Sequence, residues 1–442
     1  MTSRRRADAR TADLGTFELS ICEFAKGGEG IAHVAIDAAS RAVLVPLTVP
    51  GDVVLARVQK LAGAPRGQVL RLLHPSADRV DPPCPFFAQC GGCDWMHLSV
   101  QAQRVGREAI VRNALSHSLR DGATVLRHDS PRQLAWRRRV RVGLQASGGR
   151  VIAGLRASRS HRLVQVDRCC VLEPAIDQAR AALAGWLQGS TGFGEALIQP
   201  GHHGLPALVL RWSGDLPGQL FAQAAERVDQ GLWAGAEIWI DQAREPAVVG
   251  DPRGWMIGAD GLELRTSPGG FMQAFGDMNA LLAARAAAHL PPRQATVELF
   301  CGSGNITVMV ARSTDQLAAV ESERRAVAEA QRNLAERGLR AKVTEGDANG
   351  CSIGAGVRAV LLDPPRTGAP EASARIACSR ARRVVMVSCD PATLARDVST
   401  LLAAGFELRE LEVLEMFPHT SHMEAVAVLD RVNLAAAGRE GS

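Results

Sequence analysis

A cysteine near the carboxyl-terminal end of the sequence is placed like a nucleophile. Cys389 follows the apolar run Val384–Val387, at the end of a predicted strand. A single cysteine is more often an inert buried residue, but a thiol in a ligand crevice beside a methyl donor suits covalent catalysis. Uracil needs such a thiol, because its C5 is too weak a nucleophile to attack a methylsulfonium until a thiolate has added to C6. The surroundings would have to lower the thiol pKa from about 8.5 for this role.

The same chemistry needs a base that removes the C5 proton, so that the cysteine can leave. The segment Phe417–Glu424 offers one, because Glu424 begins an apolar strand in which partial burial would raise its pKa toward a useful range. His419 and His422 are alternatives within the segment. Taken alone, each is more often a structural histidine that makes hydrogen bonds, so Glu424 is the preferred candidate.

A glycine turn within Val297–Asn305 has the pattern of a nucleoside-binding site. A buried strand runs into Gly302 and Gly304, which let a ligand approach the backbone without intervening Cβ atoms. A dinucleotide fingerprint would need a third glycine where Thr307 stands, which argues against NAD or FAD. Glu321 ends the next predicted strand, where its carboxylate can accept hydrogen bonds from ribose hydroxyls. S-adenosylmethionine, a nucleoside cofactor without a pyrophosphate, fits these features.

Polar or reactive groups also follow other predicted strands. Asp347, Asp363 and Cys389 each come just after one, as Glu321 does. The carboxyl ends of the strands border the ligand crevice of an open α/β sheet. Two prolines after Asp363 make a stiff loop that fixes its carboxylate. Enzymes that methylate exocyclic amines usually have an aromatic residue after such prolines, so Arg366 disfavours an amine as the target.

The alternation of strands and helices from about residue 265 to 430 predicts a parallel α/β sheet. The candidate strands are Ala295–Phe300, Leu317–Glu321, Ala341–Thr344, Ala359–Leu362 and Val384–Val387, with an edge strand ending near Asp430. This sheet would position every group named above.

The first part of the chain has a different pattern. About five short strands between residues 15 and 73 predict a small closed barrel such as an OB-fold. Such barrels often bind single-stranded nucleic acid, with a mere scaffold as the alternative. A helix is expected at about 99–117, followed by a strand with a basic face of exposed Arg139 and Arg141. That face is a solvated surface or a contact for phosphates.

Three cysteines, Cys84, Cys90 and Cys93, lie on a short segment rich in proline and glycine, and a fourth ligand could come from Cys169 or Cys170. Zinc sites favour two C-x-x-C pairs or mixtures of cysteine and histidine, whereas a compact trio with a distant fourth ligand better suits a cubane iron–sulfur cluster. The spacing therefore favours iron–sulfur over zinc. It does not imply redox catalysis, because the cluster could simply join the middle of the chain.

The composition sets the class of protein. The 442 residues exceed one ordinary domain, and 46% hydrophobic with 22% charged residues is typical of a soluble globular protein. No stretch approaches the ~20 apolar residues of a membrane helix, and the basic amino-terminal segment lacks the apolar run of a secretory signal. A cytoplasmic protein without disulfides among its 10 cysteines is therefore expected. The net charge of +5 suits an anionic partner.

Six features together resemble the RNA uracil-C5 methyltransferases that make 5-methyluridine, and within them the bacterial 23S ribosomal RNA branch. They are the amino-terminal barrel, CPFFAQCGGC, ELFCGSGN, LLDPPRTG, VSCDPATLARD and FPHTSHMEAV. The resemblance implies that Cys389 is the nucleophile and Glu424 the proton acceptor. It implies an S-adenosylmethionine site lined by Gln273, Phe300, Asn305, Glu321, Asp347 and Asp363. It also implies a [4Fe-4S] cluster held by Cys84, Cys90, Cys93 and Cys169, with Cys170 standing where proline is common in the family.

The expected architecture has three parts. They are a TRAM barrel at 15–73 that binds RNA, a central α+β iron–sulfur domain at 74–262 whose helix at about 99–120 could pack on the catalytic domain, and a Rossmann-like class I methyltransferase domain at 263–432. The expected activity is methyl transfer from S-adenosylmethionine to C5 of a uridine in 23S ribosomal RNA, through a covalent bond between Cys389 and C6. No membrane and no obligate protein partner is expected.

Two alternatives stay open. The same reaction could act on the T-loop uridine of transfer RNA, although the transfer RNA branch commonly lacks both the barrel and the cysteine cluster. A non-catalytic iron–sulfur protein that binds RNA is the other alternative, and the intact Cys389, Asp363 and Glu424 argue against it.

Overall fold

The structure is a computed structural model that describes residues 12–36, 39–60, 63–119, 122–314 and 316–432. They divide into two compact units, each described here by itself. Unit 1 contains the described residues of Met1–Ala88, Gly92–Ile110 and His419–His422, and unit 2 contains those of Gln89–Gly91, Val111–Pro418 and Met423–Ser442. Helix α1 (Val100–Ala114) has residues in both units. The three-part division expected at 15–73, 74–262 and 263–432 stays a prediction, and residue 120 of the expected helix lies outside the described residues.

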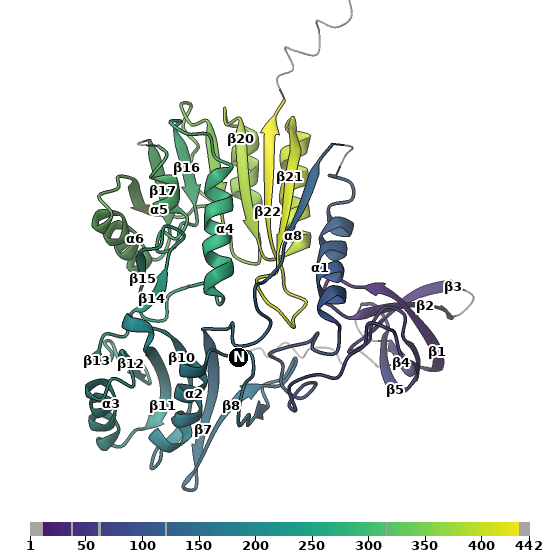
Figure 1. The fold of residues 1–442 in the computed structure, drawn as a ribbon, viewed down its shortest axis with the longest axis horizontal. Helices are drawn as coiled ribbons and strands as arrows, with labels where there is room; N and C mark the ends of the chain where they lie inside the picture. The colour runs from purple at the N-terminus through teal and green to yellow at the C-terminus, as the bar shows by residue number, and fades with distance from the viewer. Residues whose placement is uncertain (1–11, 37–38, 61–62, 120–121, 315, 433–442) are drawn as a thin grey trace, which may run out of the picture. The chain divides into compact units, whose positions relative to one another are not determined.

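Unit 1 is built around a closed five-stranded barrel (Figure 1). Its strands are β1 (Ala12–Phe24), β2 (Gly30–Ile36), β3 (Ala39–Val45), β4 (Val53–Lys60) and β5 (Arg66–His74), in the order β1-β2-β3-β5-β4. Alternate side chains point inward, so that Leu19 and Ile21 are buried while Ser20 between them is exposed. The alternating pattern therefore predicted the five strands correctly, and they run from residue 12 to residue 74 where 15 to 73 was expected.

A seven-stranded sheet forms the first part of unit 2. In the order β13-β12-β11-β10-β7-β8-β9 it contains β7 (Val140–Ser147), β8 (Arg150–Arg156), β9 (Leu163–Val164), β10 (Thr191–Pro200), β11 (Pro206–Asp215), β12 (Gly235–Ile240) and β13 (Ala247–Gly250). Helices α2 (Pro174–Trp186) and α3 (Gln219–Asp229) share its core, in which Trp186 and Leu220 are buried with Ile198 and Leu208. The short pair β14 (Gly254–Ile257) and β15 (Glu263–Thr266) follows.

The basic face expected around β7 is wrong in part. Arg141 is exposed on β7, where it forms an ion pair with Glu195 at 2.6 Å. Arg139 precedes the strand and is partly buried, and one of its Nη atoms donates a hydrogen bond to the Gly269 carbonyl oxygen at 2.9 Å. Burial lowers the pKa of Arg139 to about 10. The Arg139 guanidinium therefore binds the backbone of the loop at Gly269 and is not part of an exposed basic face.

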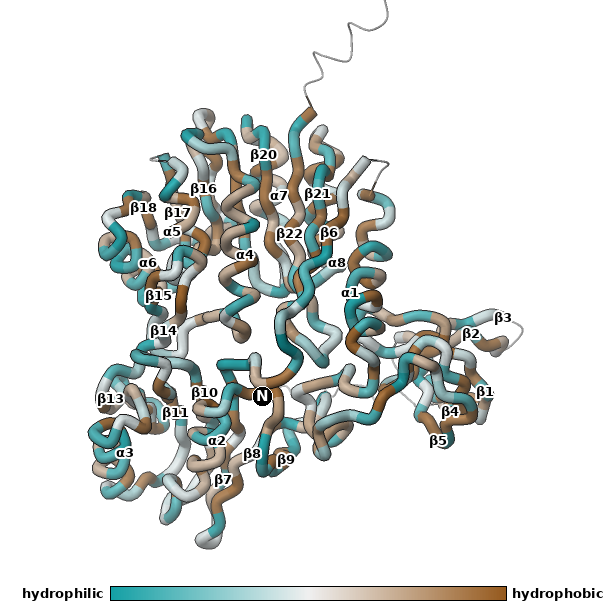
Figure 2. The backbone as a smooth tube through the Cα atoms, in the orientation of Figure 1, coloured by the Kyte–Doolittle hydropathy of each residue, from teal (hydrophilic) through white to brown (hydrophobic). Residues whose placement is uncertain are grey.

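An eight-stranded sheet with flanking helices forms the rest of unit 2 (Figure 1). In the order β18-β17-β16-β19-β20-β22-β21-β6 it contains β6 (Thr124–His128), β16 (Thr296–Leu299), β17 (Leu317–Glu321), β18 (Lys342–Glu345), β19 (Ala359–Leu362), β20 (Arg383–Ser388), β21 (Phe406–Leu414) and β22 (Glu424–Arg431). The helices are α4 (Gly276–Ala288), α5 (Thr307–Val310), α6 (Arg324–Glu336), α7 (Pro370–Ala377) and α8 (Pro391–Ala403). Figure 2 colours β20 and β22 mostly as hydrophobic, in keeping with strands that are buried on both faces. No described helix combines the length and the apolar character that a membrane crossing needs.

The strand that ends near Asp430 is not an edge strand, and that prediction is wrong. β22 lies between β20 and β21, antiparallel to both, and β6 adds a further strand beyond β21. The physical reason is visible in its composition, because an edge strand rarely carries the continuous apolar run Ala425–Leu429, which needs partners on both sides.

A buried carboxylate joins the edge of this sheet to α4. Glu412 of β21 has no exposed surface, and it accepts hydrogen bonds from His128 of β6, from Arg285 of α4 and from His289 just after α4. Burial acts to raise its pKa, but these three partners outweigh burial and hold the pKa of Glu412 at about 2. The interaction therefore stabilises the folded state when the carboxylate is charged.

We predict that Glu412→Gln lowers the free energy of unfolding at pH 7 by about 3 kcal/mol, because Arg285 loses its buried partner. The folded-state pKa lies below the ordinary value of 4.5, so the wild-type advantage is full above that value and is lost as the pH falls toward 2. Chemical denaturation of both proteins at pH 7 and pH 3 measures this. The control is Glu407→Gln, because that side chain is 43% exposed in its pair with Arg409. An equal loss of stability in both variants would contradict the prediction.

Candidate active site

The topology of the eight-stranded sheet brings the two predicted catalytic residues to one end. β20 ends at Ser388, directly before Cys389, and β22 begins at Glu424. The two strands are antiparallel with Ser388 opposite Ala425, so the end of one lies beside the start of the other. Cys389 is partly exposed, whereas Glu424 is 2% exposed. The thiol is therefore open to a ligand and the carboxyl group is shielded from solvent.

Asp363 lies at the same end of the sheet. It follows β19, which pairs in parallel with both β16 and β20, and its N–H donates a hydrogen bond to the Leu299 carbonyl oxygen at 3.3 Å. Burial raises the pKa of Asp363 to about 7. The stiff loop predicted from the two prolines thus presents a carboxyl group that holds its proton more strongly than an exposed aspartate does.

The charges of these groups affect one another. Burial raises the pKa of Glu424 well above its ordinary value, the charge of Asp363 raises it further, and Arg366 opposes both. Burial likewise raises the pKa of the Cys389 thiol to about 11, with a further rise from Glu424 and Asp363 and an opposing effect of Arg366. The sequence analysis used Arg366 only to disfavour an amine as the target. It missed that the positive charge of Arg366 lowers the pKa of both Cys389 and Glu424.

This environment does not supply the thiol activation that the sequence analysis required. The required change lowers the thiol pKa, but the surroundings of Cys389 raise it. Burial and the charges of the nearby carboxylates both disfavour a thiolate, so these surroundings favour the protonated thiol.

Helix α8 fixes the loop that carries Asp363 and Arg366. Three side chains of α8 form hydrogen bonds with the loop backbone. The Thr393 hydroxyl donates to the Arg366 carbonyl oxygen at 3.3 Å, and an Arg396 Nη atom donates to the Thr367 carbonyl oxygen at 2.9 Å. Asp397 accepts a hydrogen bond from the Ala369 N–H at 2.7 Å. Asp397 is buried and also accepts a hydrogen bond from Arg396 Nε at 2.8 Å. The spacing of Thr393, Arg396 and Asp397 places them on one helix face, and this spacing is the signal by which the sequence could have shown the contact.

The same helix begins beside the thiol. Asp390, the residue after Cys389, caps α8 by accepting hydrogen bonds from the N–H groups of Ala392 and Thr393 at 3.0 and 2.9 Å. The thiol and the Asp363 loop are therefore positioned by one rigid element.

The glycine turn has the geometry of a ligand-binding loop. Phe300, Gly302 and Gly304 all have positive φ angles of 62°, 54° and 88°, so the chain turns sharply as it leaves β16. A positive φ is unusual for a bulky residue such as Phe300 and is typical of functional sites. The Gly302 N–H donates a hydrogen bond to a carboxylate oxygen of Glu321 at 3.0 Å. The turn and the acidic residue at the end of β17 are thus brought together as the sequence predicted.

The other predicted cofactor residues are placed in different ways. Asn305 and Asn279 exchange two hydrogen bonds of 2.8 and 3.1 Å, so the amide of Asn305 joins the turn to α4. Asp347 is exposed after β18 and accepts hydrogen bonds from the N–H groups of Asn349 and Gly350. Gln273 is buried in the segment before α4.

Glu298 is a buried acid that sequence reasoning missed. It lies within β16, is 3% exposed, and burial raises its pKa to about 8. Its signal in the sequence is a charged residue inside the apolar strand Thr296–Leu299, which is costly unless the group is neutral or paired. Asp363 adds to the raised pKa of Glu298, so three acidic side chains crowd this end of the sheet together with Glu424.

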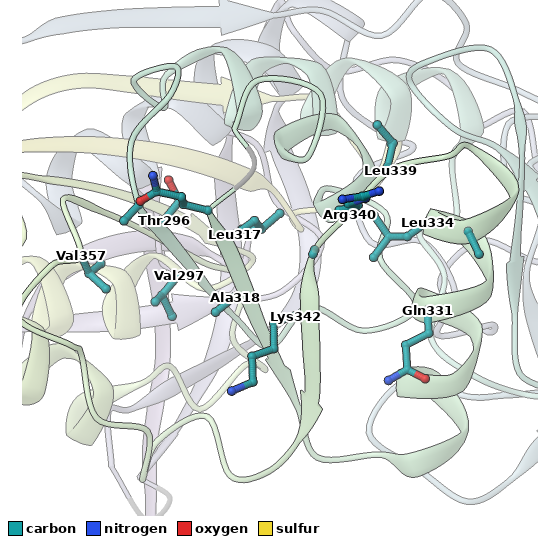
Figure 3. A pocket seen from close by; sticks show the side chains of 14 residues that line it. Thr296, Val297, Leu317, Ala318, Gln331, Leu334, Leu339, Arg340, Lys342 and Val357 are labelled. Atoms are coloured by element: carbon teal, nitrogen blue, oxygen red, sulfur yellow. The ribbon is translucent and has the colours of Figure 1, made fainter.

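A hollow of about 670 Å³ lies elsewhere on the sheet. Figure 3 shows its lining, with Thr296 and Val297 of β16, Leu317 and Ala318 of β17, and Leu334 of α6. The four strand residues belong to the amino-terminal halves of β16 and β17, away from the glycine turn. Because ligands of open α/β sheets bind at the carboxyl ends of the strands, this hollow is not the candidate active site.

His419 and His422, which precede Glu424 in the sequence, belong to unit 1, as does Gln103. The Gln103 side chain lies 3.2 Å from Nδ1 of His419 and accepts a hydrogen bond from the His419 N–H at 2.9 Å. His419 is buried and has a positive φ of 65°. Its contacts are those of a structural histidine, the reading that the sequence analysis gave as the commoner one.

The four predicted cluster ligands are divided between the units, with Cys84 and Cys93 in unit 1 and Cys90 and Cys169 in unit 2. Each is partly exposed. Within unit 2, Cys90 forms an isolated bridge with Ala157, and the Cys169 N–H donates to Asp177 at 3.1 Å. Burial raises the pKa of the Cys169 thiol. The cluster itself stays a prediction.

Two family models match this chain. One is described as tRNA (uracil-5-)-methyltransferase and matches residues 355–432, which include Asp363, Cys389 and Glu424. The other is described as methyltransferase small domain and matches residues 261–379, which include the glycine turn.

Similar proteins cover almost the whole chain. A protein of Pseudomonas putida named 23S rRNA (uracil(1939)-C(5))-methyltransferase RlmD is 33% identical over 93% of this chain and 93% of its own length. A protein of the same name from Halomonas elongata is 31% identical over 95% of this chain and 91% of its own. The crystal structure of Pyrococcus abyssi tRNA (uracil-54, C5)-methyltransferase in complex with S-adenosyl-L-homocysteine has a TM-score of 0.73 at 21% identity, and covers 93% of this chain and 100% of that one. The last likeness shows a shared fold.

One sheet of this chain carries a thiol, a buried carboxyl group and a glycine turn, and both relatives described above match over almost the whole chain and are uracil-C5 methyltransferases of 23S rRNA. The chain belongs to the family of RNA uracil-C5 methyltransferases.

Proposed function

We propose that the chain transfers a methyl group from S-adenosylmethionine to C5 of a uridine in 23S ribosomal RNA. The observation that carries this proposal is the convergence of Cys389, Asp363 and Glu424 at one end of one sheet, where their charges affect one another. The glycine turn and Glu321 beside it offer the donor site, with Gln273, Phe300, Asn305, Asp347 and Asp363 as its further residues. The choice of 23S ribosomal RNA as the substrate rests on the two relatives, which are 23S rRNA (uracil(1939)-C(5))-methyltransferases.

In the proposed mechanism, Cys389 is the nucleophilic catalyst. Its thiolate forms a bond to C6 of the uracil, and the electron pair of the C5–C6 double bond moves toward the C4 oxygen as an enolate. Bound S-adenosylmethionine supplies the methyl group that C5 then takes up. Glu424 accepts the proton from C5, and the C6–sulfur bond breaks with its electron pair returning to sulfur. The thiolate is thereby regenerated.

The burial of Glu424 suits the second half of this reaction. A carboxylate with a raised pKa is a stronger base than an exposed one, so it takes a carbon-bound proton more readily. Once sulfur is bonded to C6 it is a neutral thioether, and the repulsion between a thiolate and Glu424 is gone. The adduct therefore favours the charged carboxylate at the step that needs it.

The uridine must leave its stacked position to meet these groups. C5 and C6 lie in the plane of the base, so the target is in a loop or is flipped out, at a cost of a few kcal/mol. We propose that the barrel of unit 1 contacts the surrounding RNA. Transfer RNA is the second candidate substrate, because the Pyrococcus abyssi protein that shares this fold is a tRNA (uracil-54, C5)-methyltransferase.

We also propose that Cys84, Cys90, Cys93 and Cys169 hold a [4Fe-4S] cluster. The donor set fits, because four thiols are the usual ligands of such a cluster and each of these is partly exposed. The raised pKa of Cys169 describes the thiol without a metal, and a bound iron would remove its proton. The cluster would join segments of the chain, and no step of the methyl transfer uses it.

We predict that this chain transfers a labelled methyl group from S-adenosylmethionine to a 23S ribosomal RNA fragment that contains the uridine methylated by the relatives. Cys389→Ala should reduce the rate at least about a thousandfold while RNA binding stays nearly intact. Scintillation counting and mapping of 5-methyluridine measure this. Cys378→Ala is the matched control, because Cys378 is exposed and lies elsewhere in unit 2. Methylation of a transfer RNA T-loop in place of the 23S fragment would move the proposal to the other substrate, and activity in Cys389→Ala would refute the mechanism.

A second prediction concerns Glu424. Glu424→Gln keeps the nucleophile but removes the base, so the methylated adduct forms and cannot release its cysteine. We expect an RNA–protein complex that survives denaturation and appears as a shifted band on a denaturing gel. The double variant Cys389→Ala with Glu424→Gln should give no such band. If Glu424→Gln alone gives none either, Glu424 is not the base.

A third prediction separates the two candidates for the fourth cluster ligand. Cys169→Ser should lower the iron content of anaerobically purified protein and its cluster absorption, whereas the neighbouring Cys170→Ser should leave both close to wild type. Iron analysis and visible spectra give the readout. The reverse result would make Cys170 the ligand, and full iron in both variants would exclude the pair.

A further inference from the structure

The first strand of the barrel contains an irregularity. β1 and β2 pair antiparallel with Ile21 opposite Ala32, and the next paired residue of β1 is Glu23, opposite Ile31. Two residues of β1 therefore span one step of β2, which defines a β-bulge with Cys22 as the extra residue. Ile21 and Ala32 are both buried in the barrel core, so the bulge lies at the rim of that core.

The bulge brings two neighbouring side chains to the outer surface. In a regular strand successive side chains point to opposite faces, so Cys22 and Glu23 would not share one. In this structure both are exposed, as is His33 of β2. The Cys22 sulfur, a carboxylate oxygen of Glu23 and a ring nitrogen of His33 all lie within 4.8 Å of one another.

The direction of the thiol is fixed by the partner strand. Cys22 Sγ donates a hydrogen bond to the Ile31 carbonyl oxygen at 3.1 Å, which holds the sulfur over the first residues of β2. This contact keeps the thiol beside His33, two residues further along that strand. The three donor groups are thus brought together by backbone pairing.

The set of donors selects a class of metal ion. One thiolate, one imidazole and one carboxylate are ligands that zinc accepts in tetrahedral sites, and a site with three protein ligands leaves a fourth position for water. Magnesium and calcium prefer oxygen ligands alone, so a sulfur and a nitrogen donor disfavour them. We propose that Cys22, Glu23 and His33 form a zinc site on the outer surface of the barrel, which ties the bulged part of β1 to β2. The site shares no residue with the donor site, the catalytic groups or the proposed iron–sulfur cluster.

The test uses the full-length chain, with zinc and with cobalt(II) as a spectroscopic substitute. We expect the wild type to bind one equivalent of zinc more than Cys22→Ser does, and its cobalt difference spectrum to contain a thiolate charge-transfer band that Cys22→Ser lacks. His33→Ala should also lose this equivalent, and each of the two changes should raise the dissociation constant about a hundredfold or more, since even an outer-shell change costs 10–100-fold.

Two controls separate this site from other thiols and from damage to the strand. Ser20→Ala changes an exposed neighbour on β1 that offers no proposed ligand, and Cys378→Ser removes an exposed thiol of unit 2. Both should bind the extra equivalent like wild type. The proposal is overturned if Cys22→Ser binds as much zinc as wild type, or if Cys378→Ser loses the same equivalent. The zinc measurement uses neither RNA nor S-adenosylmethionine, so a failure here leaves the proposed reaction untouched.

Discussion

The burial of several acidic groups in one site of low dielectric is the constraint on which this candidate active site depends. Glu298, Asp363 and Glu424 all lie at one end of the sheet, and burial raises the pKa of each. The Cys389 thiol is a fourth acid beside them. Burial disfavours the charged form of each of these groups, so the site holds protons more strongly than exposed carboxylates and thiols do.

That constraint is useful only if the groups keep their places, and the fold supplies the rigidity. Cys389 directly follows β20 and Glu424 begins β22, and these two strands are adjacent and antiparallel. The hydrogen bonds between the strands therefore fix the separation of the two residues. The Asp363 loop is tied by its backbone to α8 through Asp397 and Arg396, and α8 starts directly after the thiol. A displacement of the loop would therefore have to break the buried hydrogen bond between Asp397 and the Ala369 N–H, which is more costly than turning an exposed side chain.

The sequence predicted what local patterns determine. The glycine turn, the prolines after Asp363 and the apolar strand after Glu424 each have a short-range signature, and the five barrel strands alternate clearly. What it could not predict depends on partners distant in the chain. β22 is an interior strand because it pairs with β20 on one side and β21 on the other, and β21 pairs in turn with β6, which lies far earlier in the chain. The burial of Arg139 depends on the loop at Gly269, and the amide exchange of Asn305 depends on α4. Propensity and spacing contain no information on such contacts.

The role of Arg366 follows from comparing the sizes of two effects. Its guanidinium lowers the pKa of both Cys389 and Glu424, yet burial leaves both raised. Arg366 is exposed, so water weakens its field, whereas burial disfavours the charged form of Glu424 fully and that of the partly exposed Cys389 in part. Removing water from around Arg366 would strengthen its attraction for a thiolate several-fold, because the effective dielectric constant falls from about 80 toward about 20. Further burial of the thiol alone would have the opposite effect. In the proposed mechanism, a bound uracil that excludes water from Arg366 would therefore favour the charged, nucleophilic form of the thiol.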